Sequence, residues 1–445
     1  MAGRLVVVGG DAGALSAATQ ARRRDPTMEI VAFERTSWAS YSACGIPYVV
    51  GGQVEGGVDR LVARSPQRFR EERIDLRLRH EVTSIDLEAG KVEVRNDEHQ
   101  RTFVLGFDRL HIGTGARPLR PDLPGIDLPF VHGVQTLDDA EHLLAHARDV
   151  DCRRVVVVGG GYIGLEMAEA FVNRGAEVTL VESTAQVMGT LDPELGALVG
   201  DAVRGHGIDL RTSAAVEGFE PGRVQTADGP LDADLVVLGL GVVPNSELAA
   251  DVGIRTGAKG AISVDPRQRT SHEAVWAAGD CCESFHLVSR RWVHVALGTV
   301  ANRQGRVAGI NLGGGYATFP GVVGTAVTKV CATEVARTGL TERECADAGL
   351  GFVTTTIESS TRAGYYPGAR PMTVKMLAEP GSGRLLGAQL VGEEGAGKRI
   401  DAVAVALHAG FTAQDLVDAD LAYAPPFGPL WDPVAVAARQ LLKDI

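Results

Sequence analysis

The sequence lacks the features that would place it in a membrane, in an oxidising compartment or on a nucleic acid. No apolar run approaches the roughly 20 residues needed to span a bilayer. Six cysteines in 445 residues are too few for a disulfide framework, and the opening "MAGRLVVVGG" has no small-residue cleavage site and predicts a strand. The net charge of −12 argues against nucleic-acid binding, which depends on neutralising phosphates. We therefore expect a cytoplasmic protein with reduced thiols and neither membrane nor nucleic-acid partners.

Metal-site and hydrolase motifs are also missing. No cluster of His, Cys, Asp and Glu has metal-ligand spacing, and no Ser-His-Asp pattern is apparent. Glycine, in contrast, is abundant at 55 residues, which indicates many tight turns or close approaches of the backbone to a ligand. The length predicts two to three domains.

Two segments, residues 4–35 and 153–183, share one pattern of apolar strand, glycine turn, helix, second apolar strand and terminal acid. This is the βαβ pattern of dinucleotide-binding folds. The second copy is complete, with Gly159, Gly161 and Gly164 at the G-x-G-x-x-G positions. Glu182 ends its second strand, where a carboxylate can bind ribose hydroxyls.

The first copy departs from this pattern. Gly9 is in place, but Asp11 and Ala14 stand at the second and third glycine positions. A carboxylate near a pyrophosphate is repelled unless it points away, and Gly10 and Gly13 could supply the missing flexibility. We still predict a dinucleotide-binding turn here.

The remaining segments predict further strand–turn units and a distinct C-terminal region. "FDRLHIGTGARPLRP", "ADLVVLGLGVVPN" and "AVWAAGDC" each place an apolar strand before a glycine turn. Beyond about residue 320, "VTTTIESS", "MTVKMLAE" and "RLLGAQLVG" predict antiparallel strands, and two amphipathic helices follow. This region is therefore expected to be an α+β domain.

With these motifs, the whole chain resembles the flavin-dependent pyridine-nucleotide disulfide oxidoreductases. The resemblance rests on the two dinucleotide folds, on "TGARP" and "AAGD", and on the C-terminal α+β segment. It implies an α/β fold with two Rossmann-like dinucleotide-binding domains, for FAD and for NADH or NADPH, and a C-terminal α+β domain that forms a homodimer. The implied domains are residues 1–117 with 246–320 for FAD, 118–245 for NAD(P)H and 321–445 for dimerisation.

Cys44, in "SYSACGIPY", narrows the choice within the family. Ala39 and Val49 lie five residues away on either side, so the C-x-x-x-x-C dithiol of glutathione-reductase-like members is missing. The stretch resembles instead the single-cysteine branch of coenzyme A (CoA) disulfide reductases, NADH oxidases and NADH peroxidases. We predict that Cys44 is the redox-active residue; the alternative is a small core thiol. Because a free thiol has a pKa of about 8.5, Cys44 needs an activator, either a helix N-terminus or the flavin.

Further matches favour the CoA disulfide reductases. The turn "GGDAGAL" lacks the histidine of the oxidases and peroxidases. Tyr365 and Tyr366 in "AGYYPGA" and Tyr423 in "AYAPPFGPLW" match tyrosines of the CoA reductases. Tyr365 or Tyr423 could protonate the leaving thiolate from the partner subunit, whereas Tyr365 or Tyr366 could simply pack in the interface. The resemblance also implies substrate contacts at Ser16, Gln20, Arg23, Ser40, Asn302 and Trp431.

Arginines cluster at residues 22–24 and again at residues 68–79. Such clusters are often only a solvated face. CoA disulfide, however, carries phosphates, which guanidinium groups bind well. We therefore interpret the first cluster as part of a CoA site.

The resemblance extends to the cofactor sites. Tyr162 would cover the flavin face where nicotinamide docks, Glu166 would orient the nicotinamide amide or the flavin edge, and Asp280 would bind the ribityl chain. Glu182 predicts NADH over NADPH, because no Lys or Arg follows it in "VESTAQVMGT" to neutralise a 2′-phosphate. The other predicted cofactor contacts are Gly9, Gly10, Gly13, Glu34, Arg35, Val82, Thr114, Gly115, Gly159, Gly161, Ile163, Gly164, Gly241, Leu297 and Thr299.

Two alternatives stay open. The chain could be an NADH oxidase or a persulfide or polysulfide reductase of the same branch. It could also be a flavin-bound redox sensor without turnover. The main hypothesis is NAD(P)H-dependent reduction of CoA disulfide, or of a related CoA mixed disulfide or persulfide, through Cys44 and FAD.

Overall fold

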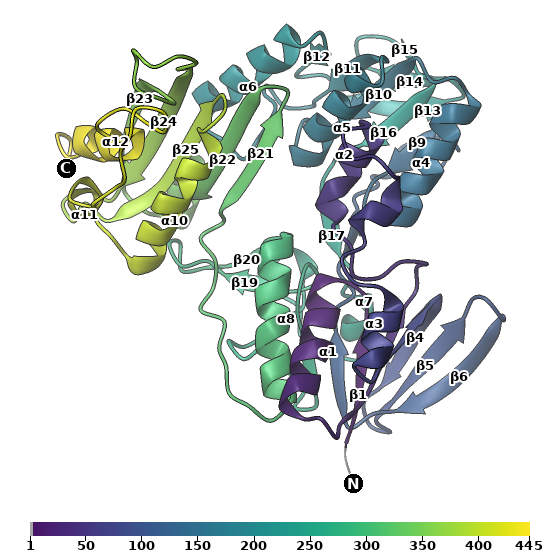
Figure 1. Ribbon diagram of the computed structural model, residues 1–445. Helices are drawn as coiled ribbons and strands as arrows, with labels where there is room; N and C mark the ends of the chain where they lie inside the picture. The colour runs from purple at the N-terminus through teal and green to yellow at the C-terminus, as the bar shows by residue number, and fades with distance from the viewer. Residues whose placement is uncertain (1–2) are drawn as a thin grey trace.

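The computed structural model describes residues 3–445 and shows three regions, each built on one five-stranded sheet (Figure 1). The first sheet is parallel, with strand order β18-β7-β1-β2-β3. Both faces of the sheet are covered, one by helices and the other by a small antiparallel sheet within residues 80–106. Its strands are β1 (Arg4–Val8), β2 (Glu29–Glu34), β3 (Ile74–Leu78), β7 (Arg109–Ile112) and β18 (Val275–Ala277).

Two helices, α1 (Ala12–Arg24) and α8 (Gly298–Leu312), pack side by side beside this sheet (Figure 1). Gly305 and Gly309 allow the close approach, because a side chain at either position would collide with backbone oxygens of α1. The other elements of this region are α3 (Pro66–Glu71), β4 (His80–Asp86), β5 (Lys91–Asn96), β6 (Arg101–Gly106), α7 (Glu247–Ala250), β19 (Glu283–Phe285) and β20 (Trp292–His294).

The second sheet is also parallel, with strand order β12-β11-β10-β16-β9. It consists of β9 (Val131–Gly133), β10 (Arg154–Val158), β11 (Glu177–Val181), β12 (Asp209–Arg211) and β16 (Leu235–Leu238). The helices of this region are α4 (Leu137–Asp149), α5 (Tyr162–Asn173) and α6 (Pro193–Gly205). A small antiparallel sheet contains β13 (Val216–Glu220), β14 (Arg223–Thr226) and β15 (Leu231–Asp232). The chain enters and leaves the region through a paired ribbon of β8 (Ala116–Pro118) and β17 (Val242–Pro244).

The third sheet is antiparallel, with strand order β21-β22-β25-β24-β23. Its strands are β21 (Ala326–Val330), β22 (Thr333–Gly339), β23 (Val353–Ser360), β24 (Pro371–Ala378) and β25 (Leu385–Gly392). The helices here are α9 (Glu342–Ala348), α10 (Ile400–Ala409), α11 (Ala413–Val417) and α12 (Pro433–Leu441).

A buried lysine links the second and third regions. Lys375, 2% exposed, pairs with Asp192 at 3.0 Å, with Glu342 at 2.7 Å and with Glu194. Asp192 and Glu194 flank the start of α6, whereas Lys375 lies on β24. Removing either partner of such an ion pair would leave a buried charge without a counter-charge. The ion pair therefore holds the second and third regions in one arrangement.

This architecture confirms the predicted fold class. Both βαβ units lie where the sequence placed them, and the C-terminal region is α+β. No helix within residues 3–445 is long and apolar enough to cross a membrane. The first two residues of the proposed FAD-binding domain lie outside the described part of the chain. We keep 1–117 with 246–320, 118–245 and 321–445 as the proposed domain limits.

Candidate active site

Both glycine turns have the backbone that a dinucleotide requires. In the second turn, Gly159 has a φ of +101°, and a side chain at Gly164 would collide with the Gly159 carbonyl. Gly161, in contrast, has open space around it, since its nearest neighbour would lie 3.8 Å from an added Cβ. Gly161 immediately precedes α5, so the first amides of that helix are accessible to a phosphate.

Glu182 folds back onto this turn. Its Oε2 accepts a hydrogen bond from Gly160 N–H at 2.8 Å, and its Oε1 accepts bonds from the N–H and hydroxyl of Thr184 at 2.8 and 2.9 Å. Glu34 repeats the arrangement in the first turn, where its Oε1 accepts from Thr36 N–H at 2.8 Å and the N–H of Gly10 also faces the carboxylate. Both acids therefore lie where ribose hydroxyls of a bound dinucleotide would meet them.

The substitutions in the first turn are explained by their neighbours. The methyl group of Ala14 fits because Gly113 faces it: a Cβ on Gly113 would lie 2.8 Å from that of Ala14. Asp11 does not cap α1; its Oδ1 accepts a hydrogen bond from Tyr41 N–H at 3.2 Å. Gly9 keeps the required positive φ of +112°. The turn therefore retains a dinucleotide-binding shape despite Asp11 and Ala14.

Asp280, which follows β18, has the geometry expected for a contact with the ribityl chain. Its Oδ1 is buried and has no hydrogen-bond partner within the described residues. Burial raises the pKa of this carboxyl to about 6. The turn itself is held firmly, because Gly279 N–H donates to Gln304 Oε1 at 2.9 Å and the His294 ring contacts the Asp280 carbonyl at 2.7 Å. A buried acceptor without a donor fits a hydroxyl group of a bound flavin chain.

Cys44 is an exposed, free thiol in a short 3-10 turn (Ala43–Gly45) directly before α2 (Ile46–Val50). The alternative of a core thiol is therefore wrong. Partial desolvation by the surrounding protein raises the pKa of the Cys44 thiol, and the negative charges of Glu166, Asp280 and Asp11 raise this pKa further. The thiol thus lies among acidic groups, which oppose its ionisation.

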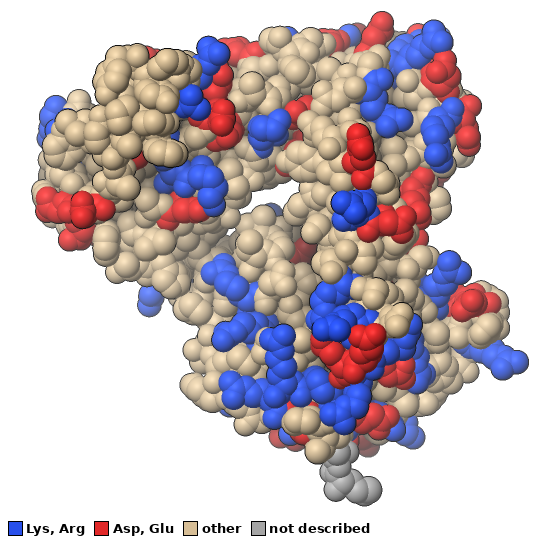
Figure 2. All heavy atoms as spheres, in the orientation of Figure 1, with Lys and Arg blue, Asp and Glu red and all other residues tan. Residues whose placement is uncertain are grey.

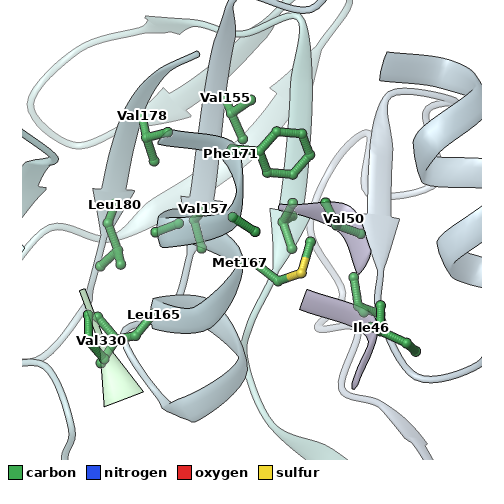
Figure 3. Close-up of a cluster of buried hydrophobic side chains, with 14 of the residues drawn as sticks. Ile46, Val50, Val155, Val157, Leu165, Met167, Phe171, Val178, Leu180 and Val330 are labelled. Atoms are coloured by element: carbon green, nitrogen blue, oxygen red, sulfur yellow. The ribbon is translucent and has the colours of Figure 1, made fainter. Parts of the chain in front are cut away.

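The helix that follows Cys44 is anchored in the core. Ile46 and Val50 are 1% and 0% exposed and pack into the cluster that contains Met167 and Phe171 of α5 (Figure 3). Burying aliphatic side chains of this size stabilises the fold by about 1.5–3 kcal/mol each. The segment bearing the thiol is therefore held rigidly against α5.

Glu166, on α5, lies close enough to Cys44 to raise the pKa of its thiol. Its Oε1 accepts a hydrogen bond from the Thr328 hydroxyl of β21 at 2.6 Å, and burial raises its own pKa. Tyr162 lies at the start of α5, and burial raises the pKa of its phenol. Thr328 was not predicted, because nothing in its local sequence distinguishes it from any other strand threonine.

The predicted substrate residues of α1 and α8 come together. Ser16 Oγ donates to Asn302 Oδ1 at 2.8 Å across the helix pair. Gln20 and Arg23 follow Ser16 on α1, and Arg23 is exposed. Lys and Arg side chains gather over this part of the molecule (Figure 2). Ser40, in a loop beside these helices, has a φ of +51° and donates its N–H to the Gly10 carbonyl at 2.8 Å.

The other predicted site residues, Tyr365, Tyr423 and Trp431, belong to the C-terminal region. The phenol of Tyr365 lies close enough to that of Tyr423 to raise the pKa of Tyr423. Both are exposed, at 77% and 43%, and Trp431 is 51% exposed. Tyr365 lies between β23 and β24, and Tyr423 and Trp431 lie in the segment before α12, whereas α2 lies beside α5 on the other side of the molecule (Figure 1). Within one chain these aromatic residues are remote from Cys44.

The remaining predicted contacts lie around the two turns and the connecting ribbon. The Thr114 hydroxyl donates a hydrogen bond to the main-chain carbonyl of Asn245 at 2.5 Å, and the side-chain amide of Asn245 donates to the main-chain carbonyl of Thr114 at 2.9 Å. Asn245 was not predicted. Gly115 and Gly241 have positive φ. Leu297 is the N-cap residue of α8, Thr299 lies in the first turn of that helix, and Ile163 lies in α5. Val82 is buried in β4, and Arg35 is exposed after β2.

Comparison with known proteins agrees with this geometry. Residues 3–305 match the pyridine nucleotide-disulphide oxidoreductases, and residues 325–433 match the dimerisation domain of the same proteins. The chain belongs to the pyridine nucleotide-disulphide oxidoreductase family. Membership makes it an FAD-dependent NAD(P)H oxidoreductase with a dimerisation domain, rather than a sensor without turnover.

Relatives within the pyridine nucleotide-disulphide oxidoreductases differ in activity. The NAD(P)H sulfur oxidoreductase (CoA-dependent) of Pyrococcus furiosus is 40% identical over 98% of this chain and 99% of its own length. An NADH oxidase of Methanocaldococcus jannaschii is 34% identical over 99% of each chain. The structure of reduced Bacillus anthracis CoADR-RHD superimposes with a TM-score of 0.96 at 33% identity, covering 100% of this chain and 80% of that one. Family membership therefore fixes the cofactors but leaves the electron acceptor open.

Proposed function

We propose that this protein uses NAD(P)H and FAD to reduce the sulfur–sulfur bond of CoA disulfide, or of a related CoA persulfide or mixed disulfide, through Cys44. The observation that carries the proposal is the single exposed thiol at the start of α2. The two cysteines that do lie together, Cys281 and Cys282 with sulfurs 3.7 Å apart, are fully buried at the end of β18. Cys44 therefore has no dithiol partner among the described residues, and we propose that it forms its mixed disulfide with the substrate.

The α1–α8 face fits the substrate. CoA is anionic and long, and the face offers the hydrogen-bonding pair Ser16 and Asn302 beside Gln20 and Arg23. Guanidinium groups bind phosphate oxygens in forked geometry. The relative from Pyrococcus furiosus is a CoA-dependent enzyme, and this supports the assignment.

With CoA disulfide, the Cys44 thiolate would attack one sulfur, a Cys44–CoA disulfide would form, and one CoA thiolate would leave; with CoA persulfide the same disulfide would form and hydrosulfide would leave. Bound FAD would pass on the two electrons of the NAD(P)H hydride, which cleave this disulfide into the Cys44 thiolate and a free CoA thiolate. Glu166, Asp280 and Asp11 disfavour the thiolate in the chain by itself. We therefore propose that the bound flavin, rather than a helix N-terminus, activates Cys44.

Tyr365 and Tyr423 would supply the proton to the leaving thiolate. Of two neighbouring phenols, one can donate a proton while the hydroxyl of the other stabilises the phenolate. Their remoteness from Cys44 within one chain supports the proposal that they act from the partner subunit of a homodimer. The exposed apolar side chains near them, Phe427 at 78% and Leu430 at 69%, support such an interface, because monomers rarely expose clustered apolar surface.

We expect a preference for NADH over NADPH, set by Glu182. Its carboxylate lies beside the second glycine turn and would repel a 2′-phosphate. In Glu182→Ala, kcat/KM for NADPH relative to NADH should rise about tenfold or more, and kcat/KM measured with both cofactors checks this. Glu177→Ala, at the exposed start of β11, is the matched control and should leave the ratio unchanged. Wild-type preference for NADPH would contradict the assignment.

The choice of substrate is tested by comparing acceptors. The anaerobic kcat/KM for CoA disulfide and for CoA persulfide should each exceed that for an uncharged disulfide such as hydroxyethyl disulfide by at least about a hundredfold, because the phosphates contribute binding. Arg23→Ala should lower the value for CoA substrates and leave that for hydroxyethyl disulfide unchanged. A turnover with oxygen that exceeds both CoA reactions would favour the NADH oxidase alternative.

A further inference from the structure

Asp11 is the residue that departs most from the expected glycine turn, and its position has a structural reason. As the residue before α1, it has the extended backbone of an N-cap, but its side chain makes no capping bond. Its Oδ1 accepts the bond from Tyr41 N–H, and the N–H of Ala12 also faces the carboxylate. The side chain therefore reaches away from the helix axis and toward the loop that carries Cys44.

This loop is attached to the turn at two consecutive residues. Ser40 N–H donates to the Gly10 carbonyl at 2.8 Å, and Tyr41 N–H donates to Asp11 at 3.2 Å. On its other side the loop pairs with the segment before α3, through Tyr41 with Val62 and through Ala63 N–H with the Ser40 carbonyl at 2.7 Å. Ser40 is strained, with a φ of +51°, so these bonds must hold its conformation. Glycine at position 11 could not provide the side-chain bond.

The charges that face Asp11 are all negative or acidic. Glu34 faces it from the end of β2, Asp280 from the turn after β18, and Tyr41 and Cys44 from the loop. Burial raises the pKa of Asp11 to about 7, and the charges of Glu34 and Asp280 act in the same direction. The ionised carboxylate in turn disfavours the Cys44 thiolate.

We propose that Asp11 is a positioning residue that ties the Cys44 loop to the first glycine turn and, when ionised, adds to the negative charge of Glu166 and Asp280 that faces the thiol. It acts through Tyr41 and through its field, not by touching the substrate. This role rests on Cys44 being the redox thiol, as proposed above. The bond and the charge can be separated, because Asn keeps an oxygen acceptor without the charge, whereas Ala removes both.

The test measures two properties of the FAD-loaded protein that need no turnover. The first is hydrogen exchange at the Tyr41 amide. The second is the pH midpoint for alkylation of the Cys44 peptide by iodoacetamide, followed by mass spectrometry. Asp11→Ala should speed exchange at Tyr41 about tenfold or more, whereas Asp11→Asn should stay within about twofold of wild type. Both variants should lower the alkylation midpoint by a few tenths of a pH unit.

Controls keep the outcome decisive. Glu29→Gln removes a carboxylate at the exposed start of β2 and should change neither property. If Asp11→Ala fails to retain FAD, Asp11→Gly replaces it, because glycine suits the turn and equally lacks the acceptor. Unchanged exchange in the acceptor-free variant, or an unchanged alkylation midpoint in Asp11→Asn, would overturn the proposal. Neither readout uses CoA disulfide. Failure of the proposed function would therefore be seen in a separate experiment, in which the Cys44→Ser variant would still turn over CoA disulfide.

Discussion

Replacing Cys44 with serine is expected to reduce turnover of CoA disulfide to a few per cent of wild type or less. A serine hydroxyl can neither attack a disulfide at neutral pH nor form the mixed disulfide. FAD content and the rate of flavin reduction by NADH should stay near wild type, since the hydrogen bonds that hold the two glycine turns do not involve Cys44. Anaerobic stopped-flow measurement of flavin reduction, together with steady-state turnover, separates the two half-reactions.

Cys152→Ser is the matched control for this change. Cys152 is half-buried just before β10, remote from the acidic groups around Cys44, and its replacement should leave turnover unchanged. If Cys44→Ser retained substantial turnover of CoA disulfide, another residue would have to carry the chemistry, and the proposed function would be wrong.

Tyr423→Phe is expected to slow CoA disulfide reduction about tenfold or more, while flavin reduction by NADH stays near wild type. The loss is expected to be smaller than for Cys44, because a CoA thiolate is already a moderate leaving group and needs only partial help from a general acid. Because Tyr365 and Tyr423 lie close together, their effects should not add: the double phenylalanine variant should lose little more than the worse single variant.

Tyr366→Phe is the control within the same segment, since this neighbour takes no part in the phenol pair. Light scattering should show a dimer for all variants. An active monomer would contradict the assignment of the tyrosine pair to the partner subunit, whereas full activity of the double variant would exclude a role in proton transfer.

The sequence predicted those features that depend on local pattern. The β-branched runs that form β1 and β10 precede glycine turns, and acids end β2 and follow β11, so both dinucleotide-binding units could be placed from the order of residues alone. The C-terminal strands and helices followed from their periodicity in the same way. The thiol of Cys44 could be singled out because no second cysteine lies at dithiol spacing.

Other features depend on contacts between residues distant in sequence, which a local pattern does not record. Ala14 could replace the third glycine only because Gly113, on a neighbouring strand end, leaves room for its methyl group. The bond between Thr328 and Glu166 requires β21 to pack beside α5. Likewise, the repulsion expected between Asp11 and a pyrophosphate is moderated because the side chain turns toward Tyr41.

The activation of Cys44 is the clearest case in which the sequence left a choice. A helix N-terminus and the flavin were equally plausible. The structure places the thiol before α2, a helix of five residues, where only its own backbone N–H lowers the pKa of the thiol, and the nearby acids outweigh this contribution. The balance of these charges depends on Glu166, Asp280 and Asp11, which only the folded chain brings together.

The central claim is that Cys44 exchanges its thiol with a CoA-linked disulfide. Mass spectrometry of the FAD-loaded protein, treated anaerobically with CoA disulfide and digested without reductant, tests it most directly. The account predicts one CoA per chain, on the peptide that contains Cys44, and its loss when NADH is added before digestion. No adduct, an adduct on another cysteine, or an adduct that persists after NADH is added would contradict it.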